Sequence, residues 1–93
     1  MVTNTIMMKL KNHGDAAKVK EMLEGMMGQI DTLLEARAYI DEARKAASYD
    51  ILYISRFPDK DGQQKYVEHP VHVGVAAALG EYVETMAMVG YEE

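Results

Sequence analysis

A tyrosine and two histidines lie close together around a proline near residue 70. The segment runs Tyr66-Val67-Glu68-His69-Pro70-Val71-His72-Val73. Proline suits the first position of a helix, where no backbone N–H is needed, so Pro70 predicts a helix start with His72 in its first turn. The free N–H groups of that turn create a positive field, which favours a neutral imidazole. A neutral His72 can accept a proton or a ligand hydroxyl, with Tyr66 one short turn upstream.

The same residues also allow a structural interpretation. His69 would cap or brace the helix start, His72 would join a structural hydrogen-bond network, and Tyr66 would cover the helix junction. The two histidines do not predict a metal site, because no second cluster supplies the remaining ligands. We therefore expect no metal and no other cofactor. His13 stands alone in a predicted turn, where we expect it to be solvated.

Composition limits the class of protein. The 93 residues predict one domain over residues 1–93, whose small core would gain stability from a second copy. The chain has no cysteine, which excludes disulfides and thiolate chemistry and fits a cytoplasmic location. A net charge of -5 with scattered basic residues argues against a nucleic-acid partner. No apolar run is long enough to span a bilayer, so we expect no membrane contact.

Methionine is unusually frequent for a chain with one phenylalanine and no tryptophan. The eight methionines are Met1, Met7, Met8, Met22, Met26, Met27, Met86 and Met88. Methionine side chains are flexible and fill irregular gaps. They therefore fit either an adaptable core or an apolar cavity that accommodates a ligand.

Hydrophobic periodicity predicts four strands and at least two helices. In chain order, the expected elements are a strand over 2–11, a helix over 16–30, strands over 33–40 and 49–57, a turn and short helix over 58–66, a helix from Pro70, and a strand over 85–91. Asp15 is the expected N-cap of the first long helix. Gly25 and Gly28 would lie inside that helix and permit close packing.

The order βαββαβ predicts an α+β fold in which right-handed crossovers place the helices on one face of a four-stranded antiparallel sheet. The other face also carries apolar residues, namely Met7, Leu52, Ile54, Ala87 and Val89. A soluble monomer would not leave such a face exposed, so we expect a homodimer through this sheet face. Four charged residues should neutralise one another in or around the interface: Glu35, Arg37, Asp50 and Arg56.

The whole chain resembles the stress-responsive α/β-barrel family, also called Dabb domains. The resemblance is carried by His69-Pro70-Val71-His72, by the ending from Val83 to Glu92, by Lys9-Leu10-Lys11 and by Ser48-Tyr49-Asp50. It implies a ferredoxin-like domain that forms a dimeric α/β barrel. Most members have no established activity, and some are known only as stress-associated proteins.

The resemblance extends to a plant enzyme of similar architecture, olivetolic acid cyclase, which closes a linear polyketide by aldol chemistry. That enzyme uses the second histidine of a His-Pro-x-His motif and an upstream tyrosine, which correspond to His72 and Tyr66. The resemblance therefore implies His72 as the base and Tyr66 as the acid or oxyanion donor. Two further histidines of that enzyme correspond to Asn4 and Ile51. Asn4 could donate a hydrogen bond, whereas Ile51 cannot transfer a proton.

Together these features predict a cavity between sheet and helices. The expected ligand-binding residues are Asn4, Ile6, Met8, Tyr53, His69, Met86 and Met88, with further residues of the first helix. An apolar cavity with a few polar groups would bind a small apolar or phenolic molecule. Three alternatives remain open: a cyclase-like lyase using His72 and Tyr66, a purely structural stress-protective dimer, and an accessory domain that acts on a partner protein.

Overall fold

A four-stranded antiparallel sheet with helices on one face forms the protein, as the computed structural model of residues 1–93 shows. The elements are β1 (Val2–Leu10), a 3₁₀ turn (His13–Asp15), α1 (Ala16–Glu24), β2 (Glu35–Ile40), β3 (Ile51–Phe57), α2 (Lys60–Glu68), α3 (Pro70–Leu79) and β4 (Val83–Glu92). The strand order is β2-β3-β1-β4, so the prediction of a ferredoxin-like fold is confirmed. None of the helices has the length and apolar character needed to cross a membrane.

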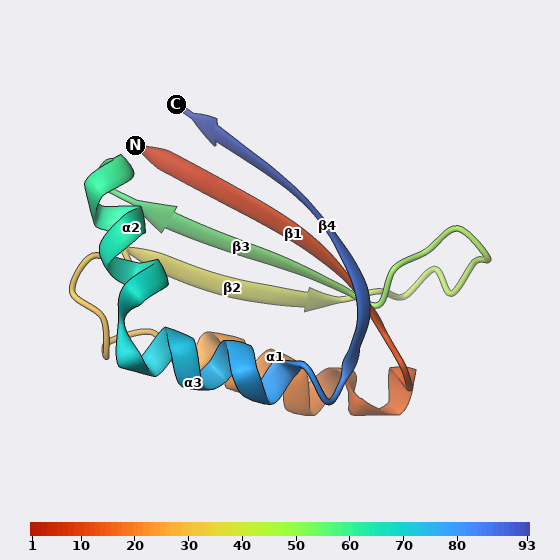
Figure 1. Ribbon diagram of the computed structural model, residues 1–93. Helices are drawn as coiled ribbons and strands as arrows, with labels where there is room; N and C mark the ends of the chain where they lie inside the picture. The colour runs from red at the N-terminus through yellow and green to blue at the C-terminus, as the bar shows by residue number, and fades with distance from the viewer.

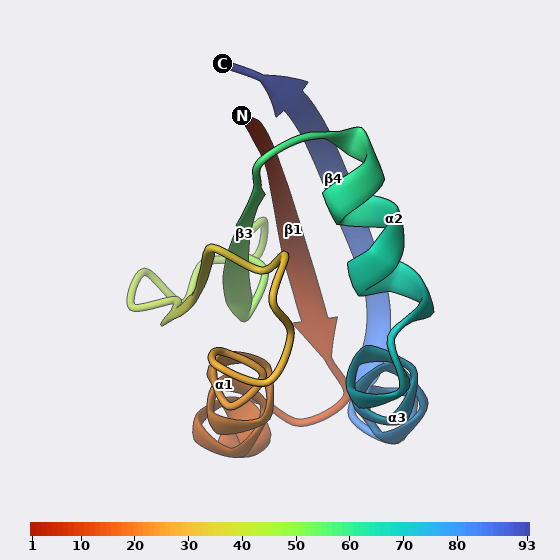
Figure 2. The ribbon, with the colours of Figure 1, turned by 90° about the vertical axis from the view of Figure 1, so that its left-hand side faces the viewer.

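The helices pack on a single face of the sheet. Figures 1 and 2 show α1 and α3 side by side against this face, with α2 at the end where β1 begins. Alternation in β1 and β3 turns every second side chain toward the helices, and Ile6 pairs across the strands with Tyr53. The buried apolar core contains Val2, Met8, Leu10, Ala16, Val19, Leu23, Met26, Ile30, Leu33, Ala36, Ala38, Ile51, Tyr53, Phe57, Tyr66 and Leu79.

The opposite face of the sheet is apolar and exposed in the single chain. Met7 lies between Leu52 of β3 and Ala87 of β4, and its side chain is 45% exposed. Val89, on the same face of β4, is 64% exposed. The expected apolar patch is therefore present on the side away from the helices.

The predicted cluster of four charges on this face is only partly formed. Glu35 pairs with Arg37 at 2.9 Å and with Arg56 at 3.3 Å. Including Asp50 in this cluster was wrong. Asp50 precedes β3 at the opposite end of the sheet, where its buried carboxylate accepts the Leu10 N–H.

The first long helix is shorter than predicted. It ends at Glu24 rather than near residue 30, because Gly25 is a weak helix former and Gly28 adopts a positive φ of 86°. The glycines therefore end the helix and do not serve close packing inside it. Asp15 occupies the N-cap position of α1 as predicted, but its side chain makes no capping hydrogen bond. Asn12 caps the preceding 3₁₀ turn by accepting the Gly14 N–H at 2.8 Å.

The junction between α2 and α3 is set by local sequence. The side chain of Asp59 accepts the Gly62 N–H at 2.7 Å and caps α2. His69 is extended, as expected for a residue before proline, and its Nδ1 accepts the Val71 N–H at 3.1 Å. Pro70 begins α3, so the predicted helix start is confirmed.

Candidate functional site

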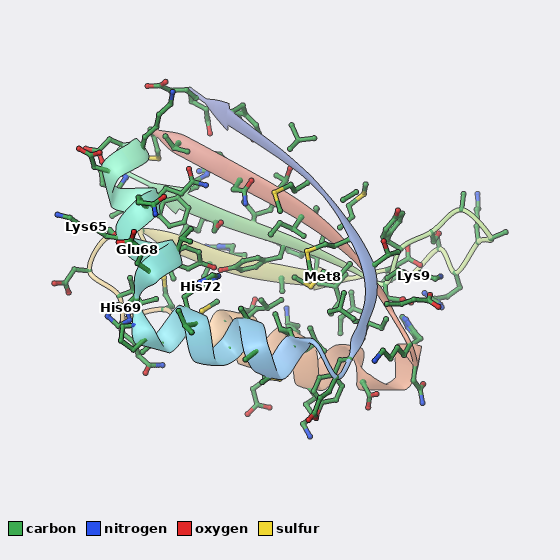
Figure 3. The ribbon with its side chains drawn as sticks, viewed as in Figure 1. Met8, Lys9, Lys65, Glu68, His69 and His72 are labelled. Carbon is green, nitrogen blue, oxygen red and sulfur yellow. The ribbon has the colours of Figure 1, made fainter.

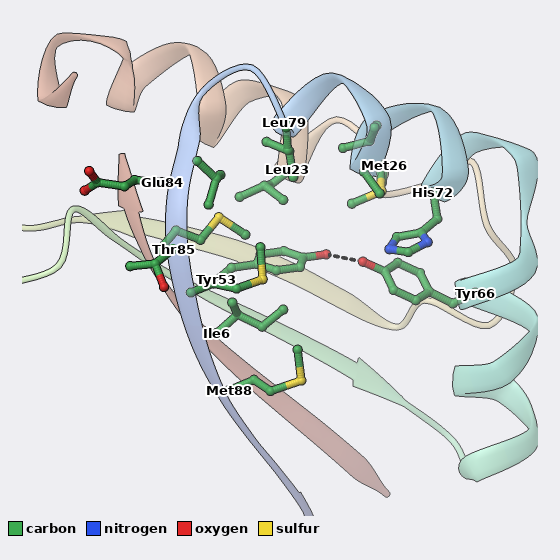
Figure 4. Close-up of a pocket in the computed structure, with 16 residues that line it drawn as sticks. Ile6, Leu23, Met26, Tyr53, Tyr66, His72, Leu79, Glu84, Thr85 and Met88 are labelled. Atoms are coloured by element: carbon green, nitrogen blue, oxygen red, sulfur yellow. Dashed lines mark hydrogen bonds between the residues drawn. The ribbon is translucent and has the colours of Figure 1, made fainter. Parts of the chain in front are cut away.

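An apolar cavity of about 450 Å³ lies between the sheet and the helices (Figure 4). Twelve of its sixteen lining residues are hydrophobic. The lining residues are Ile6, Met8, Leu23, Met26, Tyr53, Tyr66, His72, Val75, Ala76, Leu79, Gly80, Val83, Glu84, Thr85, Met86 and Met88. The cavity thus collects side chains from β1, β3, β4 and all three helical regions.

Most of the residues predicted for this site meet in the cavity. Seven of them line it: Ile6, Met8, Tyr53, Tyr66, His72, Met86 and Met88. Figure 3 shows His72 pointing into the space between α3 and the sheet, whereas His69 lies at the outer side of the helix junction.

Asn4 and His69 do not line the cavity. Asn4 precedes Ile6 by two residues in β1 and lies opposite Gly90 of β4. The imidazole of His69 turns back onto the Val71 N–H and therefore acts as a helix cap. The structural interpretation of His69 accounts for its position.

The segment from α3 into β4 supplies lining residues that were not expected, including Val75, Leu79 and Val83. The sequence predicted a helix from Pro70, but apolar residues along a helix do not by themselves distinguish a core contact from a cavity wall. No helix covers the adjacent part of β4, so Met86 and Met88 are exposed while also lining the cavity. The cavity therefore opens to solvent beside these two methionines.

The two tyrosines and the histidine of the cavity lie together at one corner, whereas Glu84 and Thr85 lie toward the other end (Figure 4). The hydroxyl oxygens of Tyr53 and Tyr66 lie 3.2 Å apart, and the two residues are 1% and 7% exposed (Figure 4). The Tyr66 ring packs between Phe57, with ring centroids 4.9 Å apart, and His72, with centroids 4.3 Å apart. These contacts hold the Tyr66 hydroxyl at the inner end of the cavity, beside the imidazole.

Both tyrosines are protonated at neutral pH. Burial raises the pKa of Tyr53, and the neighbouring Tyr66 raises it further. Burial also raises the pKa of Tyr66, although the hydrogen bond with Tyr53 opposes this. Each hydroxyl therefore keeps a proton that it can donate.

His72 presents a defined hydrogen-bonding edge. Its Nδ1 lies 3.0 Å from the carbonyl oxygen of Val67. Because a carbonyl can only accept, Nδ1 carries the hydrogen, and the neutral ring is left with Nε2 as an acceptor. The corner thus combines hydroxyl donors with a nitrogen that can take up a proton.

His13 takes no part in this cavity; its side chain is still 35% exposed, but the prediction that it stands alone was wrong. Its Nδ1 lies 2.8 Å from Oδ1 of the buried Asp50 carboxylate. The turn capped by Asn12 brings the imidazole back over the end of the sheet. The structure contains no cluster of three or more histidine, aspartate or glutamate side chains arranged to hold a metal ion.

The layered fold, with an apolar cavity under its sheet, defines a ferredoxin-like α+β protein. Residues 2–93 match the family model described as the stress responsive A/B barrel domain, Dabb. The chain therefore belongs to the Dabb family, as its resemblance indicated.

Solved structures of similar proteins agree with this fold. A dimeric protein of unknown function from Bacteroides fragilis is 23% identical, with a TM-score of 0.85 over 99% of this chain and 95% of that one. A dimeric ferredoxin-like protein of unknown function from Thermobifida fusca is 17% identical, with a TM-score of 0.85 over 99% and 90% of the two chains. A Dabb family protein from Mesorhizobium loti is 20% identical, with a TM-score of 0.78 over 99% and 95%. No match was found among curated proteins.

Proposed function

We propose that this Dabb-family chain forms a homodimer and binds a small apolar or phenolic ligand in the cavity of each subunit. The observation that carries the proposal is the cavity itself: about 450 Å³, mainly apolar, with its tyrosines and histidine at one end. Small-molecule sites have this size and this division between apolar walls and a few polar groups. A phenol would place its ring among the methionines and its hydroxyl beside Nε2 of His72.

The homodimer is supported by the exposed apolar sheet face. Met7, Leu52 and Val89 are exposed there, whereas the cavity lies on the helix side of the same sheet. Proteins of similar fold from Bacteroides fragilis and Thermobifida fusca are described as dimeric. A sheet-to-sheet dimer would bury the patch and leave both cavities accessible.

Ligand binding can be tested by thermal unfolding with a series of 4-alkylphenols. We expect these phenols to raise the melting temperature of the wild type, and His72→Ala to lose most of this shift. His69→Ala is the matched control, because it removes a histidine outside the cavity and should lower the melting temperature while keeping the shift. No shift for the wild type, confirmed by calorimetric titration, would leave the structural dimer as the better interpretation.

Proton transfer is the second candidate function, favoured by the packing of the His72 ring against the Tyr66 ring, with centroids 4.3 Å apart. His72 would remove a proton from a carbon next to a carbonyl, and Tyr66 would donate a hydrogen bond to the resulting oxyanion, as in an aldol cyclisation. Ile51 is buried and apolar, and Asn4 lies outside the cavity, so neither assists.

A simple exchange experiment tests this candidate. In D₂O the protein should accelerate deuterium exchange at the acidic carbon of a 3-oxo ester, as followed by NMR. His72→Ala should remove the acceleration. An exchange rate that the wild type leaves at the buffer value would argue against proton transfer and leave ligand binding unaffected.

A further inference from the structure

The Tyr53 hydroxyl has one hydrogen-bonding partner in the protein, the hydroxyl of Tyr66. Tyr53 lies on the central strand β3 and is 1% exposed, so water does not provide a second hydrogen-bonding partner for its hydroxyl. If Tyr66 donated to Tyr53, the Tyr53 proton would be buried without an acceptor. A buried donor without an acceptor costs about 1–3 kcal/mol. An acceptor oxygen that leaves one of its lone pairs unused is tolerated more often. Tyr53 is therefore the donor, and Tyr66 accepts.

This direction leaves the Tyr66 proton free. Both tyrosines line the cavity, but Tyr66 is the one that packs against His72, with ring centroids 4.3 Å apart, and no protein acceptor takes its hydrogen. A hydroxyl that already accepts a hydrogen bond is also a stronger donor, because the two bonds polarise each other. The cavity corner thus offers a strengthened O–H from Tyr66 and an acceptor nitrogen, Nε2, from His72.

We propose that Tyr53 is a positioning residue, which directs the Tyr66 proton into the cavity so that the corner binds a phenol or enol as its oxyanion. This inference rests on the proposed binding function. On binding, the O–H bond of the ligand breaks and its electron pair stays on oxygen. The proton forms an N–H bond at Nε2 of His72, and nothing is oxidised or reduced. The ligand oxygen then accepts the Tyr66 hydrogen bond.

The surroundings of this corner favour such a charge separation. Of the titratable groups that line the cavity, Tyr53 comes from β3, Tyr66 from α2 and His72 from α3. Glu84 of β4 lies at the far end in Figure 4. The lining residues from β1 and α1 are apolar. No fixed anion therefore competes with the ligand oxygen, and the low polarity strengthens its hydrogen bond with Tyr66.

The test uses 4-nitrophenol, whose ionised form absorbs in the visible range, and 4-nitroanisole, which has the same ring but no acidic proton. At a pH about one unit below the pKa of free 4-nitrophenol, binding to the wild type should increase the phenolate absorbance. Tyr66→Phe should lower the ratio of bound phenolate to bound phenol by on the order of thirtyfold, because it removes a direct hydrogen bond to the charged ligand oxygen. Tyr53→Phe should lower the same ratio by about fivefold, because Tyr53 acts only through Tyr66.

Two controls make the result specific. Tyr82→Phe, an equivalent change outside the cavity, should leave the ratio unchanged. Binding of 4-nitroanisole should change less than about twofold in all these variants, which shows that fold and cavity are intact. An unchanged ratio in Tyr53→Phe would overturn the positioning role. Binding of neutral 4-nitrophenol alone would overturn the inference but keep the proposed function, whereas binding of neither probe would overturn both.

Discussion

The His13 imidazole lies against the Asp50 carboxylate, with Nδ1 and Oδ1 2.8 Å apart, although 37 positions separate the two residues. Asp50 is 1% exposed and accepts two further hydrogen bonds, from the Leu10 N–H at 2.6 Å and from Nη1 of Arg44 at 2.9 Å. One carboxylate therefore connects the end of β1, the turn before α1 and the loop before β3. These polar contacts join the end of the sheet beside the buried apolar residues Leu10, Ala16 and Ile51.

Replacing the Asp50 carboxylate should destabilise the fold. In Asp50→Ala the Leu10 N–H stays buried without an acceptor, and His13 and Arg44 lose their common partner. We expect the free energy of unfolding to fall by about 3 kcal/mol, as measured by urea denaturation. The exposed Asp31 serves as the control, because Asp31→Ala should cost less than about 0.5 kcal/mol. Equal losses in the two variants would show that the Asp50 contacts do not stabilise the protein.

The same carboxylate should make stability depend on pH in the acid range. Burial raises the pKa of Asp50, but the hydrogen bonds from Leu10, His13 and Arg44 outweigh it and hold the pKa below its usual value. Its stabilising contribution is complete above the pKa of an unfolded aspartate, about 3.9, and is lost as the pH falls through the lower pKa of the folded state.

Comparison with Asp50→Asn isolates this contribution. The difference in unfolding free energy between wild type and variant should be larger at pH 5 than at pH 2, as measured by urea denaturation at each pH. A difference that stayed constant or grew toward pH 2 would contradict the lowered pKa.

The apolar sheet face predicts how the proposed homodimer can be dissociated. Val89→Asp places a charge on the edge strand β4, within the apolar face that should be buried between two subunits, so the variant should sediment as a monomer in analytical ultracentrifugation. Val73→Asp is the matched control, because Val73 is similarly exposed but lies on α3, on the helix side. Dimers that persist in Val89→Asp, or that dissociate equally in both variants, would place the interface elsewhere.

Local patterns predicted the parts of the fold that local chemistry controls. The alternation along residues 2–10 predicted which face of the sheet each side chain of β1 lies on, because successive side chains of a strand point to opposite faces. Pro70 predicted both the start of α3 and the position of His72, since proline fits only the first turn of a helix. These two patterns placed Ile6, Met8 and His72 of the cavity.

Contacts between distant parts of the chain were harder to predict. Nothing next to His13 in the sequence indicates its partner, because Asp50 reaches it only after β3 has paired with β1. The Tyr53–Tyr66 hydrogen bond is likewise formed between a strand and a later helix. His69 and His72 look equivalent in the sequence, yet one caps a helix and the other lines the cavity, because the extended conformation before Pro70 turns them in different directions.

The end of α1, which periodicity placed too late, gives a last prediction about the backbone. Gly28 has a φ of 86°, and a Cβ built there would meet no atom within 4 Å. Gly28→Ala should therefore cost about 1 kcal/mol through backbone strain alone. Gly74 lies inside α3 and has equally open surroundings, so Gly74→Ala should instead stabilise by about 0.5–1 kcal/mol. Thermal and urea unfolding of both variants measure the contrast, and a stabilising Gly28→Ala would mean that the helix continues through residue 28 in solution.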